Sequence, residues 1–379
     1  MKQSGKRKIL IIENSVHITG ALKSVCRTAY DLREDFDFVF VVPTGSKGRS
    51  WIEGKGFNRI YEVPLREISK RPLSLLLYLP MLIKNSFTIS RIARKEKADL
   101  VHVNDLYNLV MPTARLFGLF TPYVCHVRFL PEKFPKLLFG FWINIHLLFS
   151  KRIIAVSQYL AKQLPAHAAI TTIYNELPVE ERYPDGLPGW PECTILYLSN
   201  VIKGKGHVFA IEAFASIQDR FPDWRLRFVG GDMGMAKNAA YRKELQELCV
   251  DRRVAEKTEW IEFTEDVERE YRQADLALNF SESESFSITC LESLFFGCPI
   301  VATDCGGPAE IIDHQVTGIL VPKSDLGAMA AAMTDLMANA SKRKAFAEAG
   351  MKTVRSRFSI ENTSYRLKQV YNEALDRDA

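Results

Sequence analysis

The segment DLALNFSESESFSITCLESLFFGCPIVAT, residues 275–303, joins two short apolar runs through a helical pattern. The runs DLALNF (275–280) and PIVAT (299–303) are too short for helices and rich in aliphatic residues, so both are expected to be buried strands. Between them a helix is expected to begin near Phe286. A strand, a helix and a second strand in this order predict a parallel βαβ unit.

The same alternation extends along the chain in both directions. Before residue 178 the apolar, β-rich runs are KILII (8–12), DFVFVV (37–42), DLVHV (99–103), PYVCHV (122–127) and RIIAV (152–156). After residue 193, besides the two runs above, they are TILYL (194–198), RLRFV (225–229), EWIEF (259–263) and GILV (318–321). This pattern predicts an α/β protein with two Rossmann-like, doubly wound domains of parallel strands.

The two series are separated by LPVEERYPDGLPGWPEC (177–193), which is rich in proline and glycine and has no hydrophobic period. The expected domains are therefore 1–178 and 194–356, joined by a linker at 179–193. Residues 357–379 are expected to form a C-terminal helix that packs back towards the first domain. A chain of 379 residues is long enough for two such cores.

The composition limits the class of protein. With 47% hydrophobic and 25% charged residues, the chain is an ordinary globular sequence rather than a disordered or collagen-like one. Seven scattered cysteines without a CxxC pair predict a reducing compartment and no zinc cluster. The basic start Met1–Lys8 precedes an apolar run far too short for a secretory signal, so a cytoplasmic location is expected.

Charge is distributed unevenly between the two halves. Residues 1–180 carry 26 basic and 14 acidic side chains, against 24 and 31 in the remainder, which favours an anionic partner for the first half. Basic residues are densest at 66–97, around the apolar run at 72–83, and a second apolar run lies at 137–149. Both runs are too short to cross a bilayer.

We expect residues 66–97 to dock on the anionic inner face of a membrane, which makes the protein peripheral. The alternative is that both apolar runs are core helices of the first domain, and 137–149 favours this alternative. Nucleic acid is a poorer partner because no nucleic-acid-binding motif accompanies the basic charge.

Two glutamates mark the most informative chemistry. Ligands of parallel α/β sheets bind beyond the carboxyl ends of strands, where Glu284 is expected, and Glu292 is expected two turns inside the following helix. On a continuous helix the two carboxylates would lie 80° apart. Free amides of Ser285 to Ile288 would attract phosphate or sugar oxygens. The alternative makes Glu284 a helix N-cap and Glu292 a solvated surface residue.

The stretch ESFSITCLESLFFGCPIVATDCGGPAEIIDHQVTGILVP (284–322) resembles the Glu-x7-Glu region of the family 4 glycosyltransferases. Further similar stretches are YLSNVIKGKGHVFAIEAF (197–214), RFVGGD (227–232) and, more loosely, ILIIENSVHITGALKSV (9–25), AVSQYL (155–160) and IYN (173–175). The resemblance implies the GT-B fold, in which two Rossmann-like domains face each other across a cleft. It also implies transfer of a sugar from a nucleotide-diphosphate donor to a hydroxyl with retention of configuration.

The family pattern also implies roles for individual residues. Glu292 would accept hydrogen bonds from ribose hydroxyls, Glu284 would face the donor sugar, and Lys205 would neutralise the diphosphate. The implied donor-binding residues are Gly20, Asn200, Lys205, Gly230, Glu284, Phe286, Ser287, Ile288 and Glu292, and the implied catalytic residues are His126, Lys205 and Glu284. Negative charge builds on the departing nucleoside diphosphate, and a fixed cation stabilises it.

Two positions depart from the family pattern. Asn200 stands where members usually carry an arginine, so one phosphate cation is missing. Lys203 is interpreted as a solvated surface charge, with the alternative that it substitutes for that arginine. Gly20 is preceded by Thr19 rather than by a second glycine, which makes the approach of the backbone to the donor phosphates less open.

Among the histidines, His126 ends its predicted strand and matches the active-site histidine of the family. Its imidazole would hydrogen-bond a sugar hydroxyl or assist proton movement. The alternative is a satisfied core histidine, which is the interpretation for His146 and His167, and His102 is expected to be structural. Asn104 and Asp105 are possible acceptor contacts.

No metal or cofactor is expected apart from the nucleotide sugar itself. The Asp-x-Asp triplets at 35–37 and 376–378 do not follow a predicted strand, so they are interpreted as solvated. The acceptor is expected to be a glycan or lipid-linked molecule of cell-surface polysaccharide or glycoconjugate synthesis. The alternatives are a nucleotide-sugar epimerase or hydrolase on the same fold and a non-catalytic nucleotide-sugar-binding partner.

Overall fold

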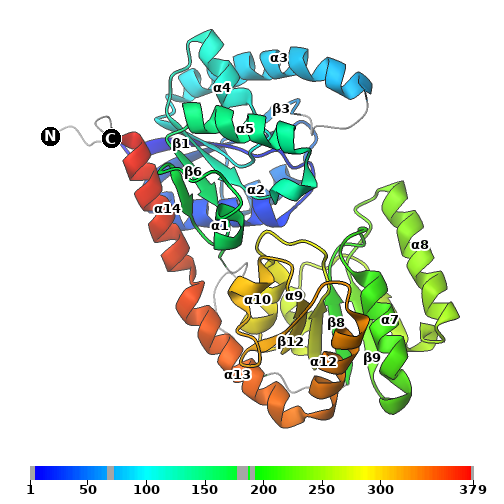
Figure 1. The fold of residues 1–379 in the computed structure, drawn as a ribbon. Coiled ribbons are helices and arrows are strands. Elements are labelled where there is room, and N and C mark those ends of the chain that lie inside the picture. Colours follow the sequence, from blue (N-terminus) through cyan, green and yellow to red (C-terminus); the bar gives the residue numbers. More distant parts are fainter. Residues whose placement is uncertain (1–4, 66–71, 177–186, 188–192, 377–379) are drawn as a thin grey trace. The chain divides into compact units, whose positions relative to one another are not determined.

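A computed structural model describes residues 5–65, 72–176, 187 and 193–376. The chain divides into two compact units: unit 1 comprises Met1–Glu176 with Ile360–Ala379, and unit 2 comprises Leu177–Ser359 (Figure 1). Each unit is a parallel sheet covered by helices, as predicted for the α/β class. The predicted linker 179–193 lies outside the described residues except for Leu187 and Cys193.

The described residues of unit 1 form a seven-stranded parallel sheet with the order β3-β2-β1-β4-β5-β6-β7. Its strands are β1 (Arg7–Ile12), β2 (Phe36–Pro43), β3 (Ile60–Val63), β4 (Leu100–Val103), β5 (Tyr123–Val127), β6 (Arg152–Ala155) and β7 (Ile170–Thr172). Its main helices are α1 (Gly20–Asp31), α2 (Gly48–Gly54), α3 (Pro72–Glu96), α4 (Val110–Ala114), α5 (Lys136–Phe149), α6 (Gln158–Ala161) and α14 (Ile360–Leu375).

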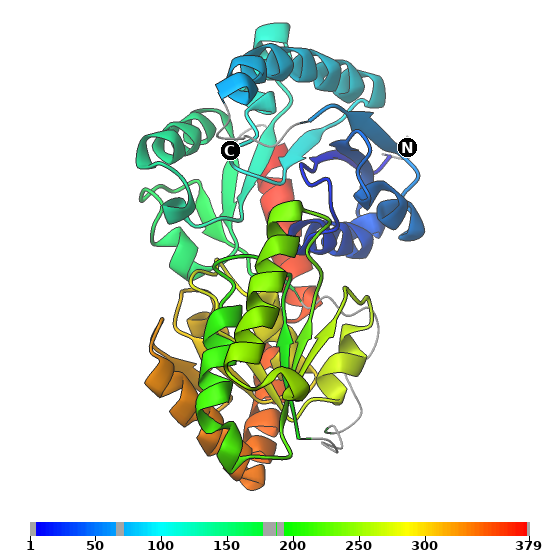
Figure 2. The same cartoon turned by 90° about the vertical axis from the view of Figure 1, so that its right-hand side faces the viewer.

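The C-terminal helix α14 completes the core of unit 1. Figures 1 and 2 show α14 running beside α1, and it also contacts β4 and β5. Its buried side chains Leu367, Val370 and Tyr371 join the hydrophobic cluster built by β1, β2 and α1. Residues distant in sequence therefore share one hydrophobic core.

The described residues of unit 2 form a six-stranded parallel sheet with the order β10-β9-β8-β11-β12-β13. Its strands are β8 (Thr194–Leu198), β9 (Arg225–Val229), β10 (Thr258–Ile261), β11 (Leu276–Asn279), β12 (Ile300–Thr303) and β13 (Gly318–Val321). Its main helices are α7 (His207–Ile217), α8 (Ala236–Asp251), α9 (Val267–Arg272), α10 (Ile288–Phe295), α11 (Pro308–Ile311), α12 (Leu326–Ala338) and α13 (Ala340–Arg357).

Every predicted strand is present, with bounds that differ by up to two residues. The structure adds β3 and β7, which are the two edge strands of unit 1. Both are short, and neither is a continuous apolar run, because β3 reads IYEV and β7 reads ITT. An edge strand has one unpaired side and fewer buried positions, so its sequence signal is weaker.

The apolar run at 137–149 lies in α5, which packs on the core of unit 1 through Phe139, Trp142 and Ile143, in line with the core-helix alternative. The opposite side of α5 nevertheless leaves Leu137 and Leu148 exposed. Within the described part of the chain, no helix combines the length and the apolar character needed to span a bilayer.

Candidate functional site

The loop between β8 and α7 is fixed in place by a glycine and a tyrosine. Gly206 has φ +80°, and a Cβ there would lie 2.0 Å from the carbonyl oxygen of Phe280, so only glycine fits. The Tyr197 hydroxyl accepts a hydrogen bond from the Phe280 amide at 2.9 Å and donates to the carbonyl of Lys205. The loop carrying Lys205 is thereby held against the carboxyl end of β11.

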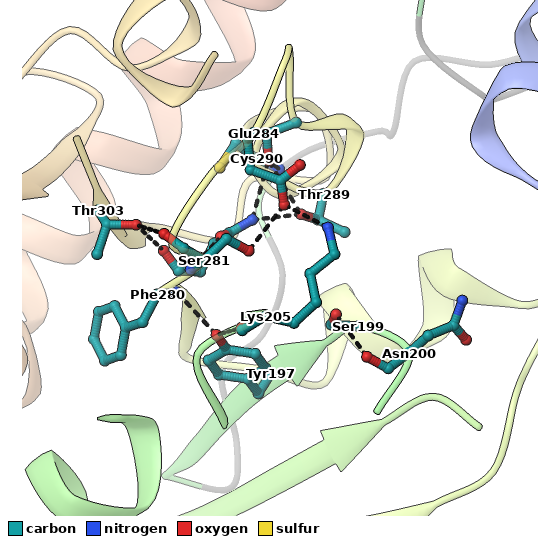
Figure 3. A network of polar contacts seen from close by, with 12 residues as sticks. Tyr197, Ser199, Asn200, Lys205, Phe280, Ser281, Glu284, Thr289, Cys290 and Thr303 are labelled. Carbon is teal, nitrogen blue, oxygen red and sulfur yellow. Dashed lines mark hydrogen bonds and ion pairs between the residues drawn. The ribbon is translucent and has the colours of Figure 1, made fainter. Parts of the chain in front are cut away.

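Lys205 and Glu284 form an ion pair at this edge of the sheet (Figure 3). The Lys205 Nζ lies 2.7 Å from Glu284 Oε1, which also accepts a hydrogen bond from the Ser281 hydroxyl at 2.8 Å. The Lys205 side chain is 31% exposed and that of Glu284 is 15% exposed. Burial lowers the pKa of Lys205, but the charge and hydrogen bond of Glu284 outweigh it and raise the pKa, so the ammonium stays charged.

The backbone of Glu284 is clamped as firmly as its side chain. Its carbonyl accepts a hydrogen bond from the Gly307 amide at 2.9 Å, and the residue forms an isolated bridge with Gly306. A Cβ on Gly307 would lie 2.1 Å from the carbonyl oxygen of Phe286, so the close approach of the two loops requires glycine. Glu284 is therefore a fixed carboxylate rather than a mobile surface one.

Helix α10 begins at Ile288, two residues later than predicted, because Ser287 is the N-cap. Ser287 has φ +89°, an uncommon conformation for a residue with a side chain, and its hydroxyl accepts hydrogen bonds from Asn279 at 3.0 Å and from the Cys290 amide. The Phe286 ring is buried and packs edge-on against Phe358. Such strain at the opening of a helix, next to a carboxylate, is typical of a binding site.

The later start corrects three expectations about the glutamates. Glu284 precedes α10, so it is not the N-cap. The angle of 80° between the two carboxylates assumed one continuous helix and does not apply. Glu292 lies one turn inside the helix instead of two. Glu292 is also not solvated, since it is only 6% exposed. The Tyr271 hydroxyl lies 3.4 Å from its Oε2 and donates more directly to the carbonyl of Thr289 at 2.9 Å.

Gly230 and Asn200 lie together at the carboxyl ends of β8 and β9. A Cβ on Gly230, which has φ +146°, would lie 2.2 Å from the carbonyl oxygen of Ser199. In Figure 3 the Asn200 side chain points away from the pair of Lys205 and Glu284. Its amide is also neutral, so Asn200 adds no positive charge to that pair.

Lys203 does not replace the missing cation in this structure. Its Nζ lies 3.2 Å from Glu244 and 5.2 Å from the ring centre of Tyr241, both on α8. The side chain is 70% exposed, which agrees with its interpretation as a surface charge.

A cavity of about 430 Å³ lies beyond the carboxyl end of β10. Its lining includes Ile261, Phe263, Thr264 and Glu270. The Gly230 amide donates to the Ile261 carbonyl at 3.0 Å, so the cavity adjoins the glycine turn after β9. None of the residues that line this cavity was predicted to contact a ligand, although a position after a strand is the expected one.

His126 and Gly20 lie in unit 1. Gly20 is the first residue of α1, directly after the N-cap Thr19, whose hydroxyl accepts from the Leu22 amide at 3.2 Å. His126 lies in β5, is only 6% exposed, and its Nδ1 lies 2.8 Å from Nε2 of His102. Burial, followed by the positive charge of Arg128, lowers the pKa of His126 well below its ordinary value, so the ring is neutral near pH 7.

Asn104, one of the possible acceptor contacts, has both ends of its side chain occupied. Its Nδ2 donates to Glu13, and its Oδ1 accepts two hydrogen bonds from Arg128, at 2.9 Å and 2.7 Å. The guanidinium of Arg128 also donates to Asn175 at 2.9 Å. Asp105 is buried beside this network. The arrangement gives Asn104 a structural role in the described protein.

The remaining histidines divide between the core and the surface. His146 is buried and satisfied, as predicted, with Nδ1 3.1 Å from the Tyr123 hydroxyl and Nε2 2.9 Å from the Leu106 carbonyl. The prediction for His167 is wrong, because its side chain is exposed and its Nδ1 accepts from the Ala169 amide. His167 lies in an irregular stretch between α6 and β7, where its sequence position gave no sign of exposure.

The first Asp-x-Asp triplet lies where β2 begins, at the amino end of the sheet. Asp35 pairs with Lys368 at 2.6 Å, and Asp37 pairs with Arg59. Asp378 lies outside the described residues. Among the residues that are described, no three His, Cys, Asp or Glu side chains are grouped closely enough to hold a metal ion.

Sequence reasoning missed the residues that hold the site together. Ser281 bonds Glu284, Thr303 donates to the carbonyl of Ser281 at 2.6 Å, and Tyr197 bonds two loops (Figure 3). All three lie at or next to the end of a strand. This position is the one feature of the sequence from which they could have been predicted.

Comparisons with known proteins cover both units. Residues 19–180 match the sequence family described as Glycosyltransferase Family 4, and residues 190–353 match Glycosyl transferases group 1. The exopolysaccharide phosphotransferase of Streptomyces coelicolor is 28% identical over 59% of this chain and 22% of its own length. The D-inositol 3-phosphate glycosyltransferase of Thermobispora bispora is 37% identical over 28% of this chain and 25% of its own length.

The chain thus spans about a quarter of the length of these two curated relatives. Among solved structures, Anabaena HepE in complex with UDP and glucose is similar over 97% of this chain and 99% of its own, with a TM-score of 0.81 and 19% identity. This likeness bears on the fold, and with it the prediction of a GT-B architecture is confirmed.

Proposed function

Since the chain belongs to the family 4 glycosyltransferases, we propose that it moves a sugar from a nucleotide-diphosphate donor to a hydroxyl with retention of configuration. The acceptor we propose is a glycan or a lipid-linked molecule in the synthesis of cell-surface polysaccharide or glycoconjugates. The family match and the nucleotide in the similar HepE structure support the donor class.

The observation that carries this proposal is the pair of Lys205 and Glu284 beside the opening of α10. Without a ligand, the ammonium is balanced by the carboxylate, which offsets part of the cost of removing the two charges from water. A bound diphosphate would draw Lys205 towards its oxygens, next to the amino end of α10. Glu284 would then accept hydrogen bonds from the hydroxyls of the sugar.

This exchange of partners stabilises the leaving group. Negative charge grows on the diphosphate as the bond to the sugar breaks, and Lys205 is held in place to meet it. We infer that the lysine and the helix opening supply this charge without a metal ion, which predicts full activity in the presence of EDTA. Glu292 would hold the ribose, and the cavity after β10 would receive the base.

A panel of nucleotide sugars tests the proposal directly. Binding to the native state alone raises the melting temperature, so the true donor should give the largest shift among the compounds. The best donor is then incubated with glycan and lipid-linked acceptors, and the anomeric configuration of the product is read by NMR. Absence of stabilisation by every nucleotide sugar would refute the proposal, and inverted products would refute retention.

The same assay separates the alternative functions. An epimerase or hydrolase would convert the donor with no acceptor present, whereas a transferase requires the acceptor for rapid turnover. A non-catalytic partner would bind the donor and leave it unchanged. Asn200, which replaces a family cation, is the feature that favours this last alternative.

We further propose that unit 1 docks on an anionic membrane, where a lipid-linked acceptor would be found. Exposed apolar side chains gather on α3, on α5 and after α4, on elements that Figure 1 shows on one side of unit 1. They are Leu79, Ile83, Phe87, Leu116, Phe120, Leu137, Phe141 and Leu148. Together with the basic residues Lys84, Arg91 and Arg115 of the same elements, they are called the apolar–basic surface. Apolar insertion and cationic attraction to lipid headgroups add to each other in such a surface.

Co-sedimentation with vesicles tests the docking. The protein should bind vesicles containing anionic lipid and ignore purely zwitterionic ones at physiological salt. The double variant Ile83→Ser/Phe87→Ser should lose binding, while Val250→Ser, at an exposed site of unit 2, should keep it. Equal binding by the wild type and the double variant would overturn the assignment of this surface.

A further inference from the structure

A line of three rings connects the C-terminal helix with His126. The Tyr371 hydroxyl of α14 lies 2.6 Å from His102 Nδ1 on β4, and His102 Nε2 lies 2.8 Å from His126 Nδ1 on β5. All three side chains are buried, and the two imidazoles lie with their ring centres 4.9 Å apart. Each hydrogen bond in this line has one proton, so the direction of donation decides which ring nitrogen of His126 is protonated.

Two proton arrangements satisfy the contact between the histidines. In the first, Tyr371 donates to His102, and His102 donates to His126 Nδ1. In the second, both donations run in the reverse direction, so that His126 Nδ1 carries the proton and the hydroxyl of Tyr371 only accepts.

Two neighbours select the first arrangement. The Tyr371 hydroxyl is buried, and His102 Nδ1 is its hydrogen-bond partner among the described residues, so the reverse direction would leave its proton without an acceptor. Arg128, which can only donate, has Nη2 3.5 Å from His126 Nδ1 and would oppose a proton on that nitrogen.

We propose that Tyr371 and His102 are positioning residues that fix His126 as the neutral tautomer with its proton on Nε2. The contacts of the His126 ring with the described residues are made by Nδ1, which leaves the Nε2–H group to donate to a ligand. Of the two roles considered for His126, the structure therefore favours donation to a sugar oxygen over removal of a proton. The catalytic part of this inference rests on the proposed function, and the tautomer itself does not.

The charge states agree with this geometry. Burial, with a smaller effect of Arg128, lowers the pKa of His102 to about 3, and burial lowers that of His126 as well. Both rings are therefore neutral near pH 7, which is the condition under which each has one donor and one acceptor nitrogen. Burial also raises the pKa of Tyr371, so its hydroxyl keeps its proton.

Nitrogen-15 NMR of the histidine side chains in the full-length protein without ligand tests the tautomer. The His126 signal, assigned by its loss in His126→Asn, should report a neutral ring with Nε2 protonated at pH 7. A proton on Nδ1, or a doubly protonated ring, would overturn the inference. This measurement needs no substrate, so its result is independent of whether the protein transfers sugars.

The variant Tyr371→Phe tests the origin of the preference. It should shift the His102 and His126 nitrogen signals and lower kcat roughly three- to tenfold, the effect of weakening one neutral hydrogen bond, with little change in the KM for the donor. Tyr365→Phe, at an exposed site on the same helix, should change neither the nitrogen signals nor kcat. Unchanged nitrogen signals in Tyr371→Phe would refute the role of Tyr371.

Substitution of His102 gives a second test that tolerates partial loss of stability. In His102→Gln the side-chain oxygen can accept from Tyr371 while the amide nitrogen donates to His126, so the Nε2–H tautomer should persist with partial activity. His102→Leu removes both bonds and should weaken the preference, because only Arg128 then opposes a proton on Nδ1. Equal nitrogen signals for His126 in the two folded variants, checked by melting curves, would overturn the proposal.

Discussion

The strand ends of the two units hold charge in different ways. In unit 2, Lys205 and Glu284 form a partly exposed ion pair at the carboxyl edge of the sheet. In unit 1, Arg128 is buried and bonded to Asn104 and Asn175, and His126 lies against His102. The comparison indicates that unit 2 holds its charged pair where solvent can reach it, whereas unit 1 uses its buried charge to keep side chains in fixed orientations.

The largest expected effect is a loss of stability when the buried hydrogen-bond network around Arg128 in unit 1 is broken. Arg128→Met leaves the buried carboxylates Glu13 and Asp105 without this cation, so the free energy of unfolding should fall by about 3 to 5 kcal/mol. Urea denaturation measures the loss. Arg33→Met, at an exposed arginine of the same unit, should cost less than about 1 kcal/mol. Equal stability of the two variants would contradict the structural role of Arg128.

Substitution in the ion pair of unit 2, Lys205 and Glu284, should reduce turnover rather than stability. Lys205→Ala should reduce turnover by about 10²- to 10³-fold, because the charge that meets the leaving diphosphate is lost, with little change in the melting temperature. Steady-state kinetics with the best donor measures the turnover of the variant and of the wild type. Lys203→Ala is the matched control and should stay within about twofold of wild type. Wild-type turnover in Lys205→Ala would remove this residue from the mechanism.

A smaller loss is expected for donor affinity at the second glutamate. Glu292→Ala should weaken donor binding by about 10- to 100-fold, the range for hydrogen bonds to a charged group, and should leave acceptor affinity unchanged. Isothermal titration with the nucleoside diphosphate measures the effect. Glu247→Ala, at an exposed position on α8, serves as control. Unchanged affinity in Glu292→Ala would exclude the proposed contact with ribose.

The smallest effect is a pH dependence of unit 1. Burial raises the pKa of Glu176 from 4.5 to about 7. Between these values the folded protein keeps a proton that the unfolded chain has released, so the free energy of unfolding should fall as the pH rises from about 4.5 to about 7. Glu176→Gln should reduce this dependence. The test is to record melting temperatures of the wild type and of Glu176→Gln across this pH range. Parallel curves of melting temperature against pH would contradict a raised pKa for the buried Glu176 carboxyl.

The sequence predicts the sheets better than the site. Buried central strands are continuous apolar runs, so β1 and β8 could be read directly, whereas the short edge strands β3 and β7 could not. The start of α10 was misplaced because Ser287 is the N-cap of the helix, and its positive φ has no signal in the local sequence.

Within the site, the predictable residues are those that form a contiguous motif. Glu284 and Glu292 could be located because they bracket one segment, and their burial could not. Tyr371 was missed as a partner of His102 because 269 positions separate the two residues in the chain. Contacts between distant segments depend on the packed fold rather than on local residue patterns.

The way the chain threads its two units has a practical consequence for protein engineering. Because α14 returns to unit 1, unit 2 is a continuous insertion, while unit 1 is encoded in two separate pieces. A cassette exchange with another glycosyltransferase would therefore replace residues 177–359 with two junctions, whereas a fragment that stops at residue 176 would lack the helix that closes its own core.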